Sequence, residues 1–347
     1  MSGGGAPLLA IEDLRVEFPT DDGPLHALDG LSVEVHEHEV LGLVGESGSG
    51  KTVAALAILG LLPKRAQVDG SVRWRGAELL GRRERDLEPL RGEEIAIVFQ
   101  DALAALNPVM TVGRQIAEAI EVHHRVEPAA RAERVVALLD LVGIPDPTGR
   151  ADQYPHQFSG GMRQRAMLAM ALANNPALLI ADEPTTALDV TLQAQVLDVL
   201  ERIRDRTGTS ILLITHDLGV VAGLADRVLV LYAGRAVEEA PVDELYAASR
   251  HPYTLGLLAS VPRLDRPRRA GPRFRIPGQP PSLVRRPAGC AFHPRCAFAA
   301  LPTPCATERP ADVEVGPEHR SACHRVDALA DLTPDDLTPD DLPPGRP

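Results

Sequence analysis

The stretch with the clearest chemistry in this chain is a glycine-rich loop that ends in Gly-Lys-Thr. A glycine and four further residues precede Gly50, Lys51 and Thr52, which is the spacing of a phosphate-binding loop. The glycines let backbone N–H groups point at phosphate oxygens, Lys51 would reach the β- and γ-phosphates, and the Thr52 hydroxyl would bind Mg²⁺. The loop consists of Gly45, Glu46, Ser47, Gly48, Ser49, Gly50, Lys51 and Thr52. It predicts a nucleotide site, with an ordinary Gly/Ser turn as the alternative.

The flanks of this loop have the pattern that its function requires. Residues 40–44 form an apolar run that predicts a buried strand, and residues 53–62 predict a helix. A helix that begins behind the loop adds the positive end of its dipole to the phosphate site. The chain has only two lysines, Lys51 and Lys64, and otherwise takes its positive charge from arginine. The lysine in the loop is therefore expected to have a chemical role in binding phosphate.

Two further strand ends carry polar side chains. The apolar run 178–181 ends in Asp182 and Glu183, a carboxylate pair that is costly at a buried strand end unless it is used. Asp182 suits Mg²⁺ binding, usually through water, and Glu183 can polarise an attacking water. The run 211–214 leads to His216, which is either structural or directed at the same crevice. These residues predict nucleotide hydrolysis.

Two other features could touch a nucleotide. Ser159, Gly160, Gly161 and Met162 precede the alanine-rich segment 166–173, so they place a serine and glycines at a helix N-terminus, which suits an anion. Phe18 lies at a predicted strand end in a chain with only 3% aromatic residues. It is either a core residue or a platform for the adenine ring.

Composition limits the class of protein. The 347 residues are 44% hydrophobic and carry a net charge of −12, which argues against a nucleic-acid binder with a basic face. No stretch reaches the roughly 18 apolar residues that span a bilayer. The N-terminus has no basic-then-apolar export signal. We therefore expect a cytoplasmic protein that reaches the membrane only through partners.

The chain order predicts one large domain and an appendage. Alternating residues at 8–18 and 28–35 predict an antiparallel layer, and a turn at Asp69-Gly70 introduces a further hairpin strand at 72–74. Helical periodicity covers residues 112–142. The predicted units are a flexible leader at 1–7, a nucleotide-binding domain at 8–250 with a helical subdomain at about 101–165, a C-terminal domain at 251–328 and a disordered acidic tail at 329–347.

All four cysteines lie in the Pro- and Arg-rich C-terminal part: Cys290, Cys296, Cys305 and Cys323. A cytoplasmic chain should not use them as disulfides. The spacings of five, eight and seventeen residues lack the close Cys-x-x-Cys pairs of zinc ribbons. Four thiolates on irregular loops suit an iron–sulfur cluster, most often [4Fe-4S], which would also staple a small segment with few core residues. Zinc and four unrelated thiols remain as alternatives.

With these residues assembled, residues 8 to about 245 resemble the nucleotide-binding subunit of an ABC transporter. The resemblance implies an α/β phosphate-loop NTPase fold with a RecA-like core, an antiparallel β layer and an inserted helical subdomain. It assigns Phe18 to adenine stacking, Gln100 to the Mg²⁺ site and the membrane subunits, and His216 to the γ-phosphate. It assigns Asp182 and Glu183 to the Walker B pair.

The resemblance also implies a site that two subunits share. Ser159–Met162 would be the signature that contacts the ATP of the partner, and Asp189 would belong to the loop that crosses to it. The signature reads Phe-Ser-Gly-Gly-Met where many members have Leu-Ser-Gly-Gly-Gln. Ser159, Gly160 and Gly161 supply the phosphate contacts, so this departure changes little.

A narrower resemblance is to the dipeptide, oligopeptide and nickel importer branch, in which cysteine-bearing tails are associated with iron–sulfur clusters. It rests on five motifs: 107–111, 154–157, 251–254, 276–281 and 293–296. It implies ATP and Mg²⁺ as ligands and ATP hydrolysis that energises import of di- or oligopeptides, with nickel or another small solute as the alternative.

The implied partners are a second ABC ATPase subunit, which is a related chain or a copy, two transmembrane permease subunits and, indirectly, an extracytoplasmic solute-binding protein. No nucleic acid is expected, and the location is the cytoplasmic face of the cell membrane. A soluble ABC ATPase acting on DNA or ribosomes is the competing class. It predicts basic patches, tandem halves or a coiled-coil insertion, which the sequence lacks. An exporter is a third possibility, against which the peptide-branch tail argues.

Overall fold

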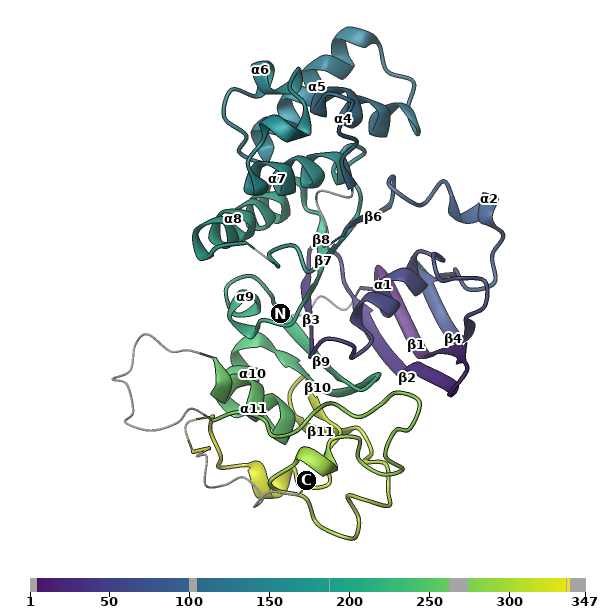
Figure 1. The fold of residues 1–347 in the computed structure, drawn as a ribbon, viewed down its shortest axis with the longest axis vertical. Helices are drawn as coiled ribbons and strands as arrows, with labels where there is room; N and C mark the ends of the chain where they lie inside the picture. The colour runs from purple at the N-terminus through teal and green to yellow at the C-terminus, as the bar shows by residue number, and fades with distance from the viewer. Residues whose placement is uncertain (1–4, 100–104, 187, 262–273, 335, 338–347) are drawn as a thin grey trace.

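The computed structural model describes residues 5–99, 105–186, 188–261, 274–334 and 336–337 (Figure 1). Two sheets organise these residues. One has four strands in the order β2-β1-β4-β5, and the other has eight in the order β11-β12-β10-β9-β3-β8-β7-β6. Helices α4, α5 and α6 lie at one end of the molecule, and the C-terminal strands lie at the other (Figure 1). The sheets thus give the predicted combination of an α/β core and an antiparallel layer.

The antiparallel layer begins the described chain. Strands β1 (Leu9–Thr20) and β2 (Gly23–Val35) pair with each other, and β4 (Gln67–Trp74) pairs with the other edge of β1, followed by the short β5 (Ala77–Glu78). One face of this layer is apolar, because Leu9, Leu14 and Val16 are buried in one cluster. The same cluster contains residues of helix α1 and of the core strands, so the layer packs against both.

The predicted turn at Asp69-Gly70 is wrong, because both residues lie inside β4. Asp69 pairs with Arg15, at a point where the register of β1 shifts between Glu12 and Arg15. Gly70 has a φ of +106°, and a Cβ there would lie 2.5 Å from the carbonyl oxygen of Asp13. The glycine is thus needed for a close approach to an irregular neighbouring strand, not for a chain reversal.

The core sheet brings the strand ends together. Strand β3 (Val40–Val44) lies between β8 (Ser210–Thr215) and β9 (Arg227–Tyr232), and all three are parallel. Strands β7 (Leu178–Asp182) and β6 (Ile95–Val98) continue the parallel order. Residues 40–44 are the predicted strand. Because parallel strands end at one edge of a sheet, the loop after β3, the acids after β7 and the histidine after β8 meet there.

The remaining elements cover the sheets and fill the ends. The helical part is an insertion between β6 and β7, and its α7 begins at the signature, six residues before the predicted alanine-rich segment. The helices are α1 (Lys51–Ile58), α2 (Glu84–Leu87), α4 (Val112–Glu121), α5 (Pro128–Leu141), α6 (Pro147–Ala151), η1 (Pro155–Gln157), α7 (Gly160–Ala171), α8 (Val190–Thr207), α9 (Leu218–Ala222), α10 (Val242–Ala248), α11 (Pro252–Ser260), η2 (His293–Arg295) and η3 (Asp327–Leu329). Within the described residues, no helix has the length and apolar content to cross a membrane.

The C-terminal segment joins the core sheet. Strand β12 (His319–Ser321) pairs with β10 (Arg235–Pro241), and β11 (Val313–Gly316) pairs with β12. The sequence predicts an irregular appendage here and gives no sign of this pairing. The start of the acidic tail also packs, because Leu329 and Leu337 are buried against α11. Spaced leucines supply apolar contacts that the acidic composition conceals, and residues 338–347 lie outside the described part.

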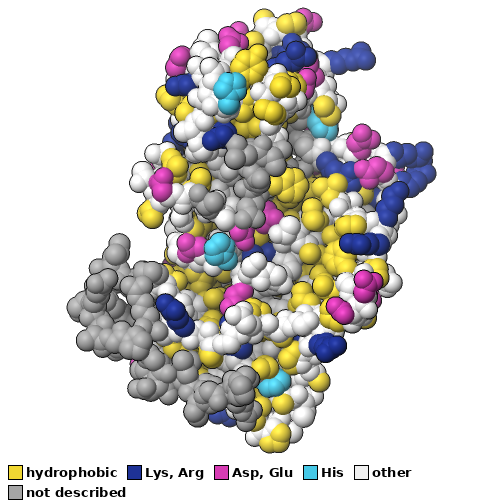
Figure 2. Space-filling view, in the orientation of Figure 1, with side chains coloured by type: hydrophobic (Ala, Val, Ile, Leu, Met, Phe, Trp, Pro, Cys, Tyr) yellow, Lys and Arg dark blue, Asp and Glu magenta, His cyan; other side chains and the backbone are white. Residues whose placement is uncertain are grey.

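On the surface shown in Figure 2, the Lys and Arg side chains are most concentrated in one group. On the face shown in Figure 2, Lys and Arg side chains gather over the α2 region, with acidic side chains among them. Arg83 and Arg85 there are exposed and both contact Asp86. The densest basic group on this face therefore includes ion-paired side chains, and other Lys and Arg side chains are scattered over the rest of the view.

Candidate nucleotide site

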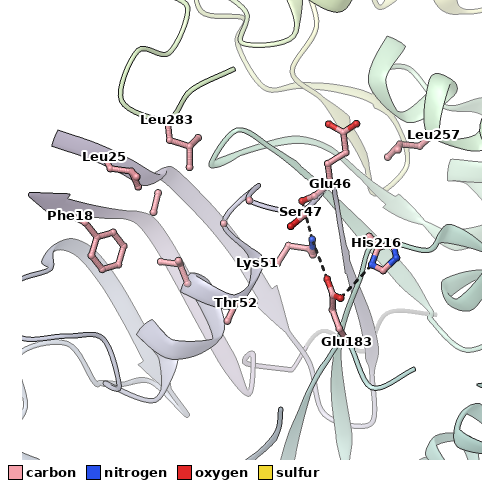
Figure 3. Close-up of a pocket in the computed structure, with 14 residues that line it drawn as sticks. Phe18, Leu25, Glu46, Ser47, Lys51, Thr52, Glu183, His216, Leu257 and Leu283 are labelled. Atoms are coloured by element: carbon pink, nitrogen blue, oxygen red, sulfur yellow. Dashed lines mark hydrogen bonds and ion pairs between the residues drawn. The ribbon is translucent and has the colours of Figure 1, made fainter. Parts of the chain in front are cut away.

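A cavity of about 570 Å³ opens at the carboxyl edge of the core sheet, between that sheet and the antiparallel layer (Figure 3). Most of the residues predicted for a nucleotide line it. They are Phe18, Glu46, Ser47, Gly48, Gly50, Lys51, Thr52, Glu183 and His216. The topology thus brings together residues that are up to about two hundred positions apart, as expected for strand ends at one edge. Gln100, predicted for the Mg²⁺ site, lies outside the described residues.

The loop after β3 has a backbone that only glycine allows at several points. Gly48 and Gly50 have φ values of +78° and +109°, in the left-handed region. A Cβ on Gly45 would lie 2.1 Å from the carbonyl oxygen of Leu231. Gly50 is also the N-cap of α1, so the loop leads directly into the helix. The first N–H groups of a helix have no partner within it, and residues Gly50, Lys51 and Thr52 at this helix start line the cavity, an arrangement that suits phosphate.

Lys51 is the cation of the cavity, although it is 5% exposed. Its Nζ donates to the carbonyl oxygens of Gly45 (2.7 Å) and Glu46 (3.1 Å) and lies 3.9 Å from Oε1 of Glu183. Burial lowers the pKa of Lys51, and the charges of Glu183 and Asp182 oppose that shift. The ammonium is therefore pointed inward by backbone acceptors, where a phosphate oxygen can replace one of them.

Asp182 and Thr52 form a pair of hard oxygen donors. Asp182 ends β7 and is 4% exposed, and burial raises its pKa while a hydrogen bond with the Thr52 hydroxyl opposes the rise. Its Oδ1 is buried and has no hydrogen-bond partner in the described part of the chain. An orphaned carboxylate oxygen beside a hydroxyl fits Mg²⁺, which prefers such ligands and retains water molecules.

Glu183 has an uncommon backbone conformation. Its φ is +49°, which is rare for a residue with a side chain, and its N–H donates to the carbonyl oxygen of Ile214 (2.8 Å). Its carboxylate accepts from the Thr186 hydroxyl (2.8 Å) and lies 3.4 Å from Nδ1 of His216. Figure 3 shows this carboxylate between Lys51 and His216. Backbone strain of this kind persists where the surroundings fix it, and it recurs at functional sites.

The predicted signature lies elsewhere on the chain. Ser159 caps α7 by accepting from the N–H of Met162 (3.3 Å), and Ser159 and Gly160 are exposed. Gly161 is buried, and a Cβ there would lie only 2.7 Å from the Leu192 side chain. None of Ser159–Met162 lines the cavity. A nucleotide bound at the loop would thus leave this helix end free for another molecule.

Asp189 is the N-cap residue of α8, where its carboxylate accepts from the N–H of Leu192 (2.9 Å). It is exposed on the same side of the chain as the signature helix, because α7 and α8 pack against each other. The cap fixes the position of Asp189 at the start of α8. It is compatible with a loop that contacts a second subunit.

Residues from the C-terminal third complete the cavity wall, and sequence reasoning missed them. Leu257 of α11 and Leu283 line it, together with Leu25, Ala27 and Val53. Leu283 is tied to β2, because its carbonyl oxygen accepts from the N–H of His26 (3.2 Å). The importer-branch motifs lie beside both leucines in the sequence and could have drawn attention to them. The residue types in those motifs do not, however, indicate that their neighbours line a nucleotide cavity.

The four cysteines converge near the core sheet. Burial raises the pKa of the Cys296 thiol, and the neighbouring Cys323, Cys290 and Cys305 raise it further, so all four lie within electrostatic range. Burial also raises the pKa of Cys323 to about 12. The backbone N–H of Cys290 donates to the carbonyl oxygen of Cys305 (2.9 Å). Among the described residues, however, no group of three or more His, Cys, Asp or Glu side chains is arranged to hold a metal ion.

The parallel sheet, the loop after β3 and the acids after β7 define a phosphate-loop nucleotide-binding protein. Residues 28–186 match the family described as ABC transporter, and residues 237–301 match the C-terminal region of oligopeptide/dipeptide transporters. The chain is 50% identical to the probable peptide ABC transporter ATP-binding protein y4tR of Sinorhizobium fredii, over 94% of this chain and 97% of that protein. The chain belongs to the ATP-binding protein family of peptide ABC transporters.

Other similarities agree with that family and with the predicted fold. The oligopeptide transport ATP-binding protein OppD of Mycobacterium tuberculosis is 55% identical over 93% of this chain. The chain spans only 53% of the length of that relative. Among solved structures, the dimeric ABC transporter cassette MJ0796 aligns with a TM-score of 0.60 and 25% identity, over 67% of this chain and 98% of that one. The protein cbiO1 of Clostridium perfringens, part of the ABC transporter complex cbiONQ, aligns with a TM-score of 0.60 and 27% identity, over 70% of this chain and 92% of that one.

Proposed function

We propose that this chain binds and hydrolyses ATP and so energises an ABC importer of di- or oligopeptides. The observation that carries the proposal is the position of Glu183, between Lys51 and His216 and beside the Asp182–Thr52 pair. This arrangement places a cation for the phosphates, oxygen donors for Mg²⁺ and a carboxylate for a water at one cavity. The names of the peptide relatives support the cargo, and nickel or another small solute is the alternative.

Each side chain has one task in this scheme. Lys51 and the N–H groups of the loop bind the phosphates, and Phe18 offers its ring to the adenine. Thr52 and Asp182 would hold Mg²⁺, which when bound neutralises charge on the phosphates. Glu183 orients the attacking water and accepts its proton, and Thr186 keeps that carboxylate in place. His216 donates toward the terminal phosphate from the opposite side of Glu183.

The proposed site is completed by a second ABC ATPase subunit, either a copy or a related chain. The exposed Ser159 and Gly160 do not reach the cavity of their own chain, so they are free to contact the nucleotide of a partner. The solved relative MJ0796 is described as dimeric, which supports the arrangement. We further propose that the pair docks on two permease subunits at the cytoplasmic face of the membrane and that an extracytoplasmic binding protein delivers the solute.

Reconstitution tests the activity and the cargo together. The chain, co-expressed with its genomic neighbours, is purified and placed in vesicles with the copurifying membrane subunits. We expect ATP-dependent uptake of a labelled oligopeptide, stimulated by the binding protein. Uptake of ⁶³Ni²⁺ instead of peptide would replace the cargo, and ATP turnover without any membrane partner would favour the soluble ATPase class.

Cross-linking tests the composite site. Cysteines are introduced at Ser49 of one subunit and Ser159 of the other, and the four native cysteines are left in place. The chain without the introduced cysteines is the control for links that the native cysteines form. A disulfide that forms only with ATP present is the expected result, because closure brings loop and signature together. Linking that does not depend on nucleotide, or no linking in an active complex, would count against a nucleotide-sandwiched dimer.

For the cysteines we propose an iron–sulfur cluster of the [4Fe-4S] type, with zinc as the alternative. The mutual proximity of four cysteines in an irregular segment, one buried and three half-buried, supports it, because such clusters accept four thiolates. Anaerobically purified protein should be brown, absorb broadly near ~400 nm and contain iron and sulfide. Colourless protein with one zinc per chain would favour zinc, and folded protein without metal would leave four unrelated thiols.

A further inference from the structure

Glu46 of the phosphate loop is bound by an arginine from the C-terminal segment. Arg295 donates from Nη1 to Oε2 of Glu46 (2.6 Å) and from Nη2 to Oε1 (3.0 Å). The two parallel bonds make a bidentate pair, the strongest geometry between these groups. The partners are 249 positions apart, and Arg295 is 6% exposed. The contact therefore joins the loop to η2 of the C-terminal segment through a buried cation.

Arg295 is itself held from three sides. Its Nε donates to the carbonyl oxygen of Pro277 (2.8 Å), and Nη1 also reaches the hydroxyl of Tyr232 (3.3 Å). The guanidinium lies over the rings of Tyr232 and Phe292, at 5.8 and 6.0 Å. A cation fixed in this way loses little conformational freedom when it binds a carboxylate. The contact is thus a preorganised feature and not a mobile surface pair.

Glu46 connects this arginine to the phosphate cradle. Its N–H donates to the Tyr253 hydroxyl (2.9 Å), and its carbonyl oxygen accepts from Nζ of Lys51 (3.1 Å). Figure 3 shows its carboxylate directed away from Lys51, while the residue still lines the cavity. Tyr253 and Arg295 thus hold the same loop residue, by its backbone and by its side chain, and both come from beyond the core domain.

The contact between Arg295 and Glu46 also changes the net charge beside the phosphate site. Three carboxylates, those of Glu183, Asp182 and Glu46, act on Lys51 at the cavity. A nucleoside triphosphate adds several negative charges there, and an unpaired carboxylate on the loop would repel it. The guanidinium offsets the charge of the carboxylate that Mg²⁺ and catalysis do not use.

We infer that Arg295 is a positioning residue for the phosphate loop: it neutralises and orients Glu46, so that ATP affinity depends on the C-terminal segment. This inference rests on the proposed function, because it concerns binding of the same nucleotide. The competing explanation is that Arg295 only attaches the C-terminal segment to the core. Attachment alone predicts lower stability of the variant, whereas positioning predicts a change in ATP affinity that depends on the charge of Glu46.

The test uses the assembled transporter and four variants. Arg295→Gln should raise the KM for ATP about 10-fold, the effect of losing one charge-assisted pair, with kcat changed less than about 2-fold. Arg295→Lys keeps the charge without the fork and should raise KM less. The double variant Arg295→Gln/Glu46→Gln removes the repelling carboxylate and should recover most of the affinity. Arg320→Gln, at the exposed residue of strand β12, is the matched control and should resemble the wild type.

The outcomes separate the two ideas. An unchanged KM in Arg295→Gln, or a double variant that binds ATP no better than the single one, overturns the inference even when the wild type hydrolyses ATP. A wild-type complex that neither binds nor hydrolyses ATP overturns the proposed function first. If Arg295→Gln does not fold, as judged by its thermal midpoint, the KM of Arg295→Lys decides: a value equal to the wild type contradicts the role of the bidentate contact.

Discussion

The core sheet and the C-terminal segment meet at one cavity, but they reach it in different ways. The core presents its polar residues directly after strands β3, β7 and β8, where the hydrogen-bonded ladder fixes their positions. The C-terminal segment lines the cavity with Leu283, on irregular backbone, and contacts the phosphate loop through Arg295 of η2. The first arrangement supplies reacting groups, and the second supplies a wall and a support. Their difference predicts which substitutions should affect turnover and which should affect affinity.

The two regions are nevertheless joined by a continuous sheet. Strand β12 adds to the edge of β10, and His319 on β12 places Nε2 2.9 Å from Oε1 of the fully buried Glu238. Glu238 also accepts from the N–H of His251, which begins the motif before α11. The C-terminal segment is thus anchored by backbone pairing and a buried polar contact, and its contacts with the cavity depend on that anchor.

The largest effect should come from the core. Glu183→Gln keeps the shape of the side chain but cannot accept a proton, so turnover should fall at least ~10²-fold while ATP affinity is kept. Single-turnover hydrolysis and nucleotide binding measure the two quantities separately. Glu201→Gln on the exposed face of α8 is the matched control. Normal turnover in the Glu183 variant would remove this residue from the mechanism.

A smaller loss is expected from the cation of the loop. Lys51→Ala removes a charge-assisted contact to the phosphates, which is worth about 1.5–3 kcal/mol, so ATP should bind roughly 10- to 100-fold more weakly. The chain offers an apt control in Lys64→Ala, the other lysine. Equilibrium binding to a fluorescent ATP analogue decides the matter. Equal affinities of the two variants would contradict a phosphate contact for Lys51.

The anchor of the C-terminal segment should matter for stability. His319→Ala leaves the buried carboxylate of Glu238 without that partner, which should lower the free energy of unfolding by about 1–3 kcal/mol. Urea unfolding followed by circular dichroism measures the change. His324→Ala, at a half-buried histidine of the same segment that contacts the carbonyl oxygen of Glu308, should have a smaller effect. If both variants unfold at the same urea concentration, the His319 contact does not stabilise the joined sheet.

The features that could be predicted from the sequence lie mainly in the core sheet, and those that could not lie mainly in the C-terminal segment. The strand at 40–44 and the acids after β7 were predictable, because local apolar runs lead straight into the chemical residues. The signature was also recognised as a helix start, although the helix begins at Gly160 and not at the alanine-rich run. Local pattern therefore gave the reacting groups and most of the parallel core.

The remaining features depend on contacts between distant parts of the chain. The pair of Arg295 and Glu46 joins residues that are 249 positions apart, and a Pro-rich segment has no periodicity that indicates which side chain turns inward. The Asp69-Gly70 pair is typical of a turn, but Gly70 is needed because two strands approach each other closely there. The motifs that contain Tyr253 and Arg295 were recognised as typical of the importer branch, yet their contacts with the loop could only be found in the folded structure.

The smallest effect tests the wall that the C-terminal segment contributes. Leu283 is partly buried and lines the cavity near Leu25 and Phe18 (Figure 3), so its side chain should contact the base and not the phosphates. Leu283→Ala removes methyl groups that are only partly shielded from water. A loss of about 1 kcal/mol, or roughly 5-fold in ATP affinity, is expected.

The readout that distinguishes a base contact is the comparison of two ligands. Inorganic triphosphate has the phosphates without the base, so Leu283→Ala should leave its affinity unchanged while ATP binds more weakly. Leu301→Ala, an exposed leucine of the same segment, is the matched control and should affect neither ligand. Equal losses for ATP and triphosphate would mean that Leu283 acts through the loop, as Arg295 does, and the wall and the support would then be one feature of the C-terminal segment.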